Sequence, residues 1–527
     1  HAVKAGADVL AAGGTAADAL VAVQLVLGLV EPQSSGIGGG AFLLYYDQAA
    51  KEIQTYDGRE TAPAGVTPDY FLKPDGNKLG FYDAVVGGKS VGVPGVLAML
   101  EKAHNEHGKL PWAQLFDRAI QLSKSGFEIS PRLHFLLDRD KHLRTKTVAA
   151  KYFYHADGSA KSVGTLLQNP ELATTLTQIA QSGAAVFYTG DIADSIINAV
   201  NSDTTNPGLL TRTDMAAYKA KKRAPICVLY HSHKVCGMGP PTSGGITSLQ
   251  ILKLLEPFNL KQFEPSSVEA INLISEASAL AFADRGLYLG DEDFVEIPKE
   301  GLLSPAYISR RASLISKGES HIPFLAGTPN KKAYNLTPDT AIELPSTSHF
   351  SVVDGNGNAV SMTTSVENVF GSRLMTRGFM LNNQLTDFSF NPEKEGVRVN
   401  NRIEAGKRPR SSMSPTIVLN QDDSLHLVIG SPGGSRIIGY VTKTIIGVLD
   451  WSMDVQQAIN MPHYVNRNGT LDLESETNLT DQKEALEALG YKVKLRTLNS
   501  GLHGILVEGE MLKGGADPRR EGVVLAN

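Results

Sequence analysis

A change of character at residue 347 constrains this chain more than any other feature of its sequence. Residues 317–346 are rich in Pro, Gly, Asn and Lys and show no hydrophobic period, which is typical of an exposed loop or linker. From Thr347 onward the sequence is strand-like and rich in hydroxyl groups. We therefore expect a regular strand to begin abruptly where a loose linker ends.

The strand that begins at Thr347 is expected to turn back on itself. Residues 354–357, Asp-Gly-Asn-Gly, form a strong hairpin turn, and residues 358–365 are predicted as the return strand. Pairing Val353 with the first residue of that strand places Thr347 opposite Thr364. This predicted strand register has a tolerance of about one residue.

The length and composition limit the class of protein. With 527 residues, the chain suggests roughly two to four domains or one large layered unit. Hydrophobic residues make up 42% and charged residues 20%, which excludes a disordered chain, a coiled coil and a collagen-like fibre. The net charge of -5 implies no strongly basic surface, so nucleic acid is not an expected partner. No apolar run has the length of a membrane span. Alternating strands and helices without internal repeats favour a layered α/β or α+β architecture.

Two helices are well marked. Residues 15–30 form an apolar helix, and a long helix is predicted from about residue 267 to residue 287. Ser266 and Glu269 have the spacing of a capping box at the start of the long helix. The sequence opens without a methionine, and residues 2–13 already look helical, so we expect a truncated or processed end.

The two cysteines, Cys227 and Cys236, flank a predicted hairpin turn at His231-Ser232. If the turn has two residues, the cysteines face each other as a non-hydrogen-bonded pair with Cα atoms about 4.5 Å apart. That separation permits a disulfide, which would indicate an oxidising compartment. Two ordinary buried thiols remain the alternative, because the register of the turn is assumed.

Several polar groups could build a site. Gly433 and Gly434 follow the apolar strand 425–429 and precede a helix-like segment, so their N–H groups could form an anion nest; a tight turn is the alternative. The run is neither a Walker A motif nor GxGxxG. Other candidates could bind a carboxylate or an ammonium, although each alone also fits a polar surface turn. They are Arg59, Ser411 and Ser412 for a carboxylate, and Gln384 and Asp387 for an ammonium.

Other kinds of site find no support. The thirteen histidines show no HExxH or paired Cys/His spacing, so we expect no metal and no zinc site. No GxSxG nucleophile elbow occurs. Residues 291–293, Asp-Glu-Asp, are expected to be a solvated acidic face rather than a cation site.

Together, these motifs closely resemble those of the gamma-glutamyltransferases, or glutathione hydrolases, of the N-terminal-nucleophile hydrolase superfamily. The resemblance covers nearly the whole chain, and the motifs occur in the family's order. They are EPQSSGIGGG, DGRETAP, GGKSVGVPG, GPPTSGG, TSHFSVVD, MLNNQLTDFS, RPRSSMSPT, GSPGGSR and ADPRR.

The resemblance implies an α+β fold, a four-layer αββα sandwich, in place of several separate domains. It also implies self-cleavage between Ser346 and Thr347. The products would be a large piece, residues 1–346, and a small piece, residues 347–527, intertwined as one structural domain.

The same resemblance assigns the catalytic roles. Thr347 Oγ would be the nucleophile, with its freed α-amino group as base, because an α-amino pKa of roughly 7.7–8.0 suits that task. It would attack a γ-glutamyl amide such as glutathione and pass the acyl group to water or to an amino acid or peptide. Ser365 would be the second hydroxyl of the pair. Gly433 and Gly434 would form the oxyanion hole.

Substrate contacts follow from the same resemblance. Arg59, Ser411 and Ser412 would hold the α-carboxylate, and Gln384 and Asp387 would receive the α-ammonium. No cofactor is implied. An exported protein, periplasmic or secreted, is expected, because bacterial members of the family are usually exported.

Two departures from the best-known members bear on specificity. Glu367 stands where many members have Asn; an ionised carboxylate there could serve only the α-ammonium, or could pair with Arg373 or Arg59. The stretch from Phe388 to Arg410 is shorter than in members with a lid, which would leave the site open. Both leave room for a cephalosporin-acylase-like enzyme acting on glutaryl amides. Less favoured are an uncleaved, catalytically silent binding protein of the same fold and a nucleotide-binding α/β protein.

Overall fold

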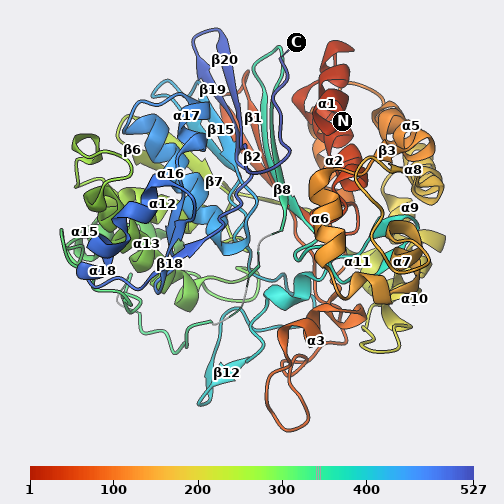
Figure 1. Cartoon of the computed structure of the whole chain (residues 1–527), viewed down its shortest axis with the longest axis horizontal. Helices are drawn as coiled ribbons and strands as arrows, with labels where there is room; N and C mark the ends of the chain where they lie inside the picture. Colours follow the sequence, from red (N-terminus) through yellow and green to blue (C-terminus); the bar gives the residue numbers. More distant parts are fainter. Residues whose placement is uncertain (331, 340, 342, 345, 527) are drawn as a thin grey trace.

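The computed structural model describes every residue except 331, 340, 342, 345 and 527. Its two largest sheets contain strands from both sides of residue 347 (Figure 1). The first has five strands in the order β5-β2-β1-β9-β8. Its members are β1 (Gly40–Asp47), β2 (Glu52–Gly58), β5 (Lys221–Arg223), β8 (Ser348–Val353) and β9 (Ala359–Ser365).

The second large sheet has six strands in the order β20-β19-β15-β14-β7-β6. Its members are β6 (Ile226–Tyr230), β7 (His233–Gly237), β14 (Thr416–Leu419), β15 (Leu425–Gly430), β19 (His503–Glu508) and β20 (Met511–Ala516). The short strands form three pairs and a three-stranded sheet. They are β3 (Phe127–Glu128), β4 (Leu166–Leu167), β10 (Met375–Thr376), β11 (Phe379–Met380), β12 (Glu393–Lys394), β13 (Val397–Arg398), β16 (Tyr464–Asn466), β17 (Leu471–Glu474) and β18 (Val493–Arg496).

Helices lie in two groups on opposite sides of the large sheets (Figure 1). The first group comes from the N-terminal part: α1 (Ala2–Ala11), α2 (Ala16–Val30), α3 (Phe81–Val85), α4 (Val96–His107), α5 (Asp117–Ser125), α6 (Pro131–Arg139), α7 (Thr147–Phe153), α8 (Pro170–Ser182), α9 (Ala185–Tyr188), α10 (Asp191–Asn201) and α11 (Arg212–Ala217). The second comprises α12 (Gly244–Leu255), α13 (Val268–Tyr288), α14 (Lys299–Leu303), α15 (Pro305–Ala312), α16 (Ile437–Leu449), α17 (Val455–Asn460) and α18 (Lys483–Ala488).

The strand β1 shows why both sheet faces are buried. Its side chains alternate between two hydrophobic cores, because successive residues of a strand point to opposite faces. Leu43 and Tyr45 belong to the core shared with α2 and α4, whereas Phe42 and Leu44 belong to the core shared with the second sheet. Contacts of β8 and β9 with β15 join the two sheets. A strand buried on both faces needs a nearly continuous apolar sequence, as found here.

The predicted hairpin after residue 347 is present, but its register differs by one residue. Val353 pairs with Ala359 rather than with Asn358, so Ser348 rather than Thr347 lies opposite Thr364. The reason is the Asp354 carboxylate, which accepts a hydrogen bond from the Asn358 backbone N–H at 3.0 Å and closes a three-residue loop. Such loops favour a left-handed last residue, and Gly357 has φ 83°.

The predicted helices are confirmed, with one capping error. Thr15 caps α2 in a capping box with Asp18. The cap of α13 is Ser267, whose side chain accepts from the Ala270 backbone N–H, so the capping box predicted one residue earlier was wrong. The first turn of α13 keeps Glu269, which favours the positive end of the helix dipole.

Of the two alternatives for the cysteines, the structure contains the disulfide. Cys227 and Cys236 face each other across β6 and β7 with Cα atoms 4.1 Å apart, and they form a disulfide. The two-residue turn at His231 and Ser232 gives the register assumed from the sequence. Two free thiols are therefore excluded.

The acidic residues 291–293 are not simply a solvated face. Asp291 is 1% exposed and accepts a hydrogen bond from the Arg408 backbone N–H at 2.9 Å. Arg223 binds Asp293 at 2.8 Å, and it also binds Asp57 of β2. The prediction failed because basic residues distant in sequence meet this loop and neutralise it.

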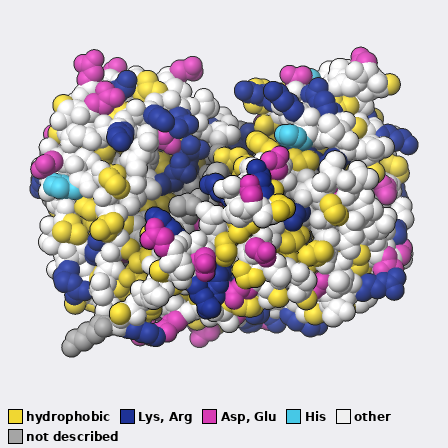
Figure 2. All heavy atoms as spheres, turned by 90° about the horizontal axis from the view of Figure 1, so that it is seen from below, with side chains coloured by type: hydrophobic (Ala, Val, Ile, Leu, Met, Phe, Trp, Pro, Cys, Tyr) yellow, Lys and Arg dark blue, Asp and Glu magenta, His cyan; other side chains and the backbone are white. Residues whose placement is uncertain are grey.

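On the face seen in Figure 2, Lys and Arg side chains are interspersed with Asp and Glu, and no continuous basic stripe crosses it. Within the described residues, no helix combines the length and the apolar character needed to cross a bilayer.

Candidate active site

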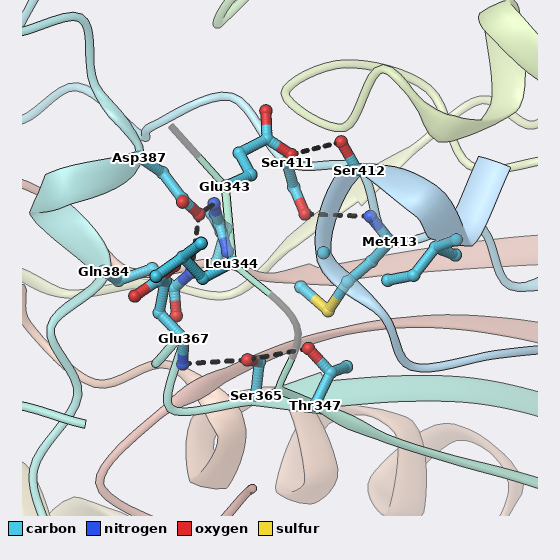
Figure 3. Close-up of a pocket in the computed structure, with 13 residues that line it drawn as sticks. Glu343, Leu344, Thr347, Ser365, Glu367, Gln384, Asp387, Ser411, Ser412 and Met413 are labelled. Atoms are coloured by element: carbon cyan, nitrogen blue, oxygen red, sulfur yellow. Dashed lines mark hydrogen bonds and ion pairs between the residues drawn. The ribbon is translucent and has the colours of Figure 1, made fainter. Parts of the chain in front are cut away.

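Segments far apart in the sequence meet at one pocket beside the start of β8 (Figure 3). Its empty volume is about 280 Å³. All of the predicted site residues line it except Gly433, together with residues that the sequence patterns did not single out. The lining residues are Arg59, Glu343, Leu344, Thr347, Ser365, Glu367, Gln384, Asp387, Ser411, Ser412, Met413, Gly434 and Ile437.

Thr347 is buried and held in an unusual backbone conformation. Its φ is 108°, a value that a β-branched residue rarely adopts, and such strain costs on the order of 1–3 kcal/mol. Thr347 Oγ1 lies 3.1 Å from Ser365 Oγ. Ser365 Oγ in turn accepts a hydrogen bond from the Glu367 backbone N–H at 2.8 Å (Figure 3). The Ser365 proton is therefore free to point toward Thr347.

The backbone on either side of Thr347 is also anchored. Arg520 donates a hydrogen bond to the Thr347 carbonyl oxygen at 2.9 Å, and Ser346 Oγ donates to the Gln33 carbonyl at 3.0 Å. Burial, followed by the charge of Arg132, lowers the pKa of Arg520 to about 9. Arg520 belongs to the ADPRR motif, but the sequence gives it no predicted role, since nothing local links it to Thr347.

The glycine pair after β15 adopts conformations that need glycine. Gly433 has φ 141° and Gly434 has φ 60°. A Cβ on Gly434 would lie 2.7 Å from the Leu344 carbonyl oxygen, so the backbone upstream of Thr347 packs directly on Gly434. A Cβ on Gly433 would lie 2.8 Å from the Tyr440 ring, and Gly433 is not one of the residues that line the pocket.

Arg59 is a buried residue, not a solvated turn arginine. It follows β2 and is fully buried. Its guanidinium contacts Asp387 Oδ2 at 2.5 Å and the carbonyl oxygens of Pro409 and Arg410 at 3.0 Å each. The predicted carboxylate-binding arginine thus touches the predicted ammonium-binding aspartate.

The short 3-10 turn Gln384–Asp387 presents the other polar groups. Gln384 Nε2 donates to Asp387 Oδ2 at 2.8 Å, while Gln384 Oε1 is buried and has no hydrogen-bond partner among the described residues. Glu367 accepts a hydrogen bond from Asn383 Nδ2. Arg373 instead binds Asp140 at 2.8 Å, so the suggested pairing of Glu367 with Arg373 is wrong.

Three buried carboxyl groups, two in the pocket lining and one next to Arg59, have raised pKa values. Burial raises the pKa of Glu60, behind Arg59, to about 8, although Arg59 opposes the shift. Burial raises the pKa of Asp387 to about 6, again against Arg59. Burial, followed by the charge of Asp387, raises the pKa of Glu367 well above its usual range. A cationic group entering this pocket would favour the ionised carboxylates.

The predicted carboxylate-binding serines lie opposite this acidic wall. Ser411 Oγ accepts a hydrogen bond from the Met413 backbone N–H at 3.1 Å. Ser412 Oγ donates to the side chain of Glu343, which comes from the linker before Thr347. Arg285 of α13 also contacts Ser412 Oγ, at 2.7 Å. The sequence patterns did not reveal Arg285, because it lies in a helix that otherwise looks like core.

The segment that corresponds to a lid, Phe388 to Arg410, forms only the small β12–β13 hairpin. This hairpin projects at the bottom of Figure 1. Among the described residues, no group of three or more His, Cys, Asp or Glu side chains is arranged to hold a metal ion. The arrangement is a buried hydroxyl pair, a glycine turn and charged groups of both signs. It can support nucleophilic attack on an amide whose acyl part is zwitterionic.

Comparison with known proteins gives a consistent result. The family model described as gamma-glutamyltranspeptidase matches residues 2–527. The chain is 37% identical to the glutathione hydrolase proenzyme of Bacillus subtilis strain 168, covering 99% of this chain and 89% of that protein. It is 36% identical to the glutathione hydrolase proenzyme of Escherichia coli K12, covering 98% of this chain and 89% of that protein.

Among solved structures, the chain is similar to a cephalosporin acylase from Bacillus halodurans. The TM-score is 0.84 at 25% identity, covering 99% of this chain and 94% of the other. The architecture is therefore shared along nearly the whole length of both chains.

Proposed function

The chain belongs to the gamma-glutamyltranspeptidase family, and we propose that it is a glutathione hydrolase and γ-glutamyltransferase with Thr347 as nucleophile. The observation that carries the role of Thr347 is the 3.1 Å approach of its Oγ1 to Ser365 Oγ, inside a pocket with groups for both ends of an amino acid. The relatives' name, proenzyme, agrees with a chain that must be processed.

Self-cleavage would come first. Thr347 Oγ attacks the Ser346 carbonyl carbon, the peptide bond breaks, and the proton of the hydroxyl passes to the departing Thr347 nitrogen. Water then hydrolyses the resulting ester and frees Thr347 as an N-terminal residue. The strained φ of 108° at Thr347 favours this step, because breaking the peptide bond releases the strain.

Turnover would use the same hydroxyl. The freed α-amino group accepts the Thr347 Oγ proton, and Oγ attacks the γ-carbonyl of the substrate. The N–H groups of Gly433 and Gly434 stabilise the oxyanion. The leaving amine takes the proton, and water or an amino acid or peptide then attacks the acyl-enzyme.

Two sets of pocket residues would bind the two charged groups of the substrate. Ser411 and Ser412, with Arg59, would receive the α-carboxylate. Gln384 and Asp387 would receive the α-ammonium, helped by Glu367, because all three present oxygen acceptors to the pocket.

We further propose a four-layer αββα sandwich, self-cleaved into residues 1–346 and 347–527. Because both large sheets mix strands from the two pieces, the cut would leave them joined. The Cys227–Cys236 disulfide favours an exported, periplasmic or secreted protein, since such bonds persist in oxidising compartments.

Three anilides test the specificity. A γ-glutamyl anilide and a glutaryl anilide differ only in the α-amino group, and a butyryl anilide lacks the carboxylate as well. We expect the γ-glutamyl anilide to react fastest and the butyryl anilide slowest. Equal rates for the first two would refute the roles of Gln384 and Asp387. A faster glutaryl anilide would instead favour the second candidate, an acylase acting on glutaryl amides, which the likeness to cephalosporin acylase supports.

A further inference from the structure

The side chain of Glu343, from the linker upstream of Thr347, lines the pocket. Ser412 Oγ donates to one of its oxygens, and the Arg285 guanidinium pairs with the other. Arg410 lies 3.7 Å from the same oxygen as Arg285. Although burial alone would raise it, Arg285 and Arg410 hold the pKa of the Glu343 carboxyl below its usual range. The pocket wall therefore already contains one paired carboxylate, in its ionised form.

A second linker carboxylate is bound close by. Asp339 lies 2.7 Å from Arg410, and it also accepts a hydrogen bond from Asn401 Nδ2 at 2.8 Å. The segment upstream of the proposed cleavage point is thus attached to two buried arginines by two carboxylates. Neither arginine belongs to the linker.

The guanidinium of Arg285 is held in an orientation that allows it to bind a carboxylate beside Ser412. Its Nε donates to Ser243 Oγ at 2.8 Å, which fixes the guanidinium plane, and a terminal nitrogen donates to Ser412 Oγ at 2.7 Å. The only carboxylate within ion-pair distance of Arg285 among the described residues is Glu343. If Glu343 leaves, a buried cation loses its counter-ion, a strongly unfavourable state unless another anion replaces it.

Arg59, the other arginine proposed to hold the α-carboxylate, is also paired within the chain. Its guanidinium is bound to Asp387 and to two backbone carbonyls. The internal carboxylate in the pocket is held by Arg285 and Ser412 rather than by Arg59.

We propose that Arg285 extends the α-carboxylate site of Arg59, Ser411 and Ser412. Glu343 fills the part held by Arg285 and Ser412 before cleavage, and the α-carboxylate of the substrate fills it afterwards. This subsite deepens, and rests on, the proposed γ-glutamyl function. Glu343 has two effects in the uncut chain. It holds the linker across Gly434 next to Thr347, and it excludes small carboxylates from the pocket. Cleavage frees the linker end, and the subsite becomes available to substrate.

The first test uses the uncut chain, with L-glutamate as the probe and calorimetry as the measurement. Thr347→Ala keeps Glu343 in place and should bind L-glutamate weakly or not at all. Adding Glu343→Ala should raise the affinity by about tenfold or more, and adding Arg285→Lys to that double variant should remove the gain. The control is Glu319→Ala on the Thr347→Ala chain, because the Glu319 side chain is in the same linker but 70% exposed.

The second test uses the mature enzyme. Arg285→Lys should raise KM for a γ-glutamyl anilide by about tenfold and change kcat much less. Arg311→Lys is the matched control: both side chains are 8% exposed, and Arg311 pairs with Asp284, next to Arg285 on α13, outside the pocket. Its KM should stay near that of the wild type.

Two results would overturn the subsite. One is L-glutamate binding that is unaffected by Glu343→Ala. The other is an unchanged KM in cleaved Arg285→Lys. Either could occur while the wild type still hydrolyses γ-glutamyl anilides, in which case the proposed function stands without this subsite. Loss of the function itself would appear separately, as a wild type that does not react with these anilides.

Discussion

Two buried charge clusters lie near each other in this molecule, and they differ in where their partners come from. In the structural cluster, Arg408 binds Asp57 at 2.5 Å and Arg223 binds the same carboxylate at 2.8 Å. In the site cluster, Arg285 binds Glu343 of the linker. The partners in the first cluster belong to folded elements, whereas the carboxylate in the second comes from the segment upstream of the proposed cut. The ion pairs of the first cluster join parts of the folded chain, whereas we propose that the second cluster exchanges its anion.

The largest expected effect on stability lies in the structural cluster. Arg223→Leu should lower the free energy of unfolding by about 3 kcal/mol, because it leaves buried Asp57 with one cation fewer. Urea unfolding of the Thr347→Ala chain measures it. The kcat/KM of folded Arg223→Leu enzyme should stay close to that of the wild type. A large drop in kcat/KM without loss of stability would remove the distinction between the clusters.

The charged groups that line the pocket should show the reverse pattern. Asp387→Asn should lower kcat/KM for a γ-glutamyl anilide by about 10- to 100-fold, because the α-ammonium loses a charged acceptor. The rate with a glutaryl anilide, which has no ammonium, should change much less. Steady-state kinetics with both substrates measure the difference. A parallel loss with both anilides would show that Asp387 acts on Arg59 and not on the substrate.

The disulfide hairpin offers a third, uncharged comparison. Replacing Cys227 and Cys236 together by Ser should reduce the free energy of unfolding by about 2 kcal/mol, because the bond closes a short loop. Activity should be unaffected, since neither cysteine lines the pocket. Chemical denaturation and anilide hydrolysis of the double variant provide the two measurements. Loss of activity in the still-folded variant would connect this edge hairpin to the site.

A fourth comparison concerns the pH dependence of stability. Burial raises the pKa of Glu60 from 4.5 to about 8, so the folded chain holds this proton more tightly than the unfolded chain. This contribution is fully present below pH 4.5 and is lost as the pH rises toward 8. Melting temperatures of the Thr347→Ala chain should therefore fall over this range, and less so in its Glu60→Gln variant. Identical slopes for the two chains would contradict the assigned shift.

Features of the fold and the site could be predicted from the sequence where the interacting residues are close together along the chain. The cysteine pair followed from counting along one hairpin, and Thr347 stood out where a linker met a strand. The register of the other hairpin differs by one residue, within the tolerance of its prediction, because the Asp354 side chain closes its loop. Arg59 taken alone also fitted a polar surface turn, since only tertiary packing shows that it is bound to Pro409 and Arg410.

Arg285, Arg520 and Glu343 could not be found from local sequence. Each meets the site across a long separation, through a helix, the C-terminal segment or an aperiodic linker. The resemblance to a family supplied the candidate residues. The structure brings all of them except Gly433 to the lining of one pocket, and it adds the charged groups around them.

The central claim is that Thr347 cuts its own chain and then serves as nucleophile, and intact-mass measurement with N-terminal sequencing tests it most directly. Purified wild type should give two polypeptides, residues 1–346 and 347–527, with the second beginning at Thr347. The Thr347→Ala chain should stay whole and inactive. A wild type that remains one chain after long incubation yet hydrolyses γ-glutamyl anilides, or a second polypeptide beginning at another residue, would contradict the claim.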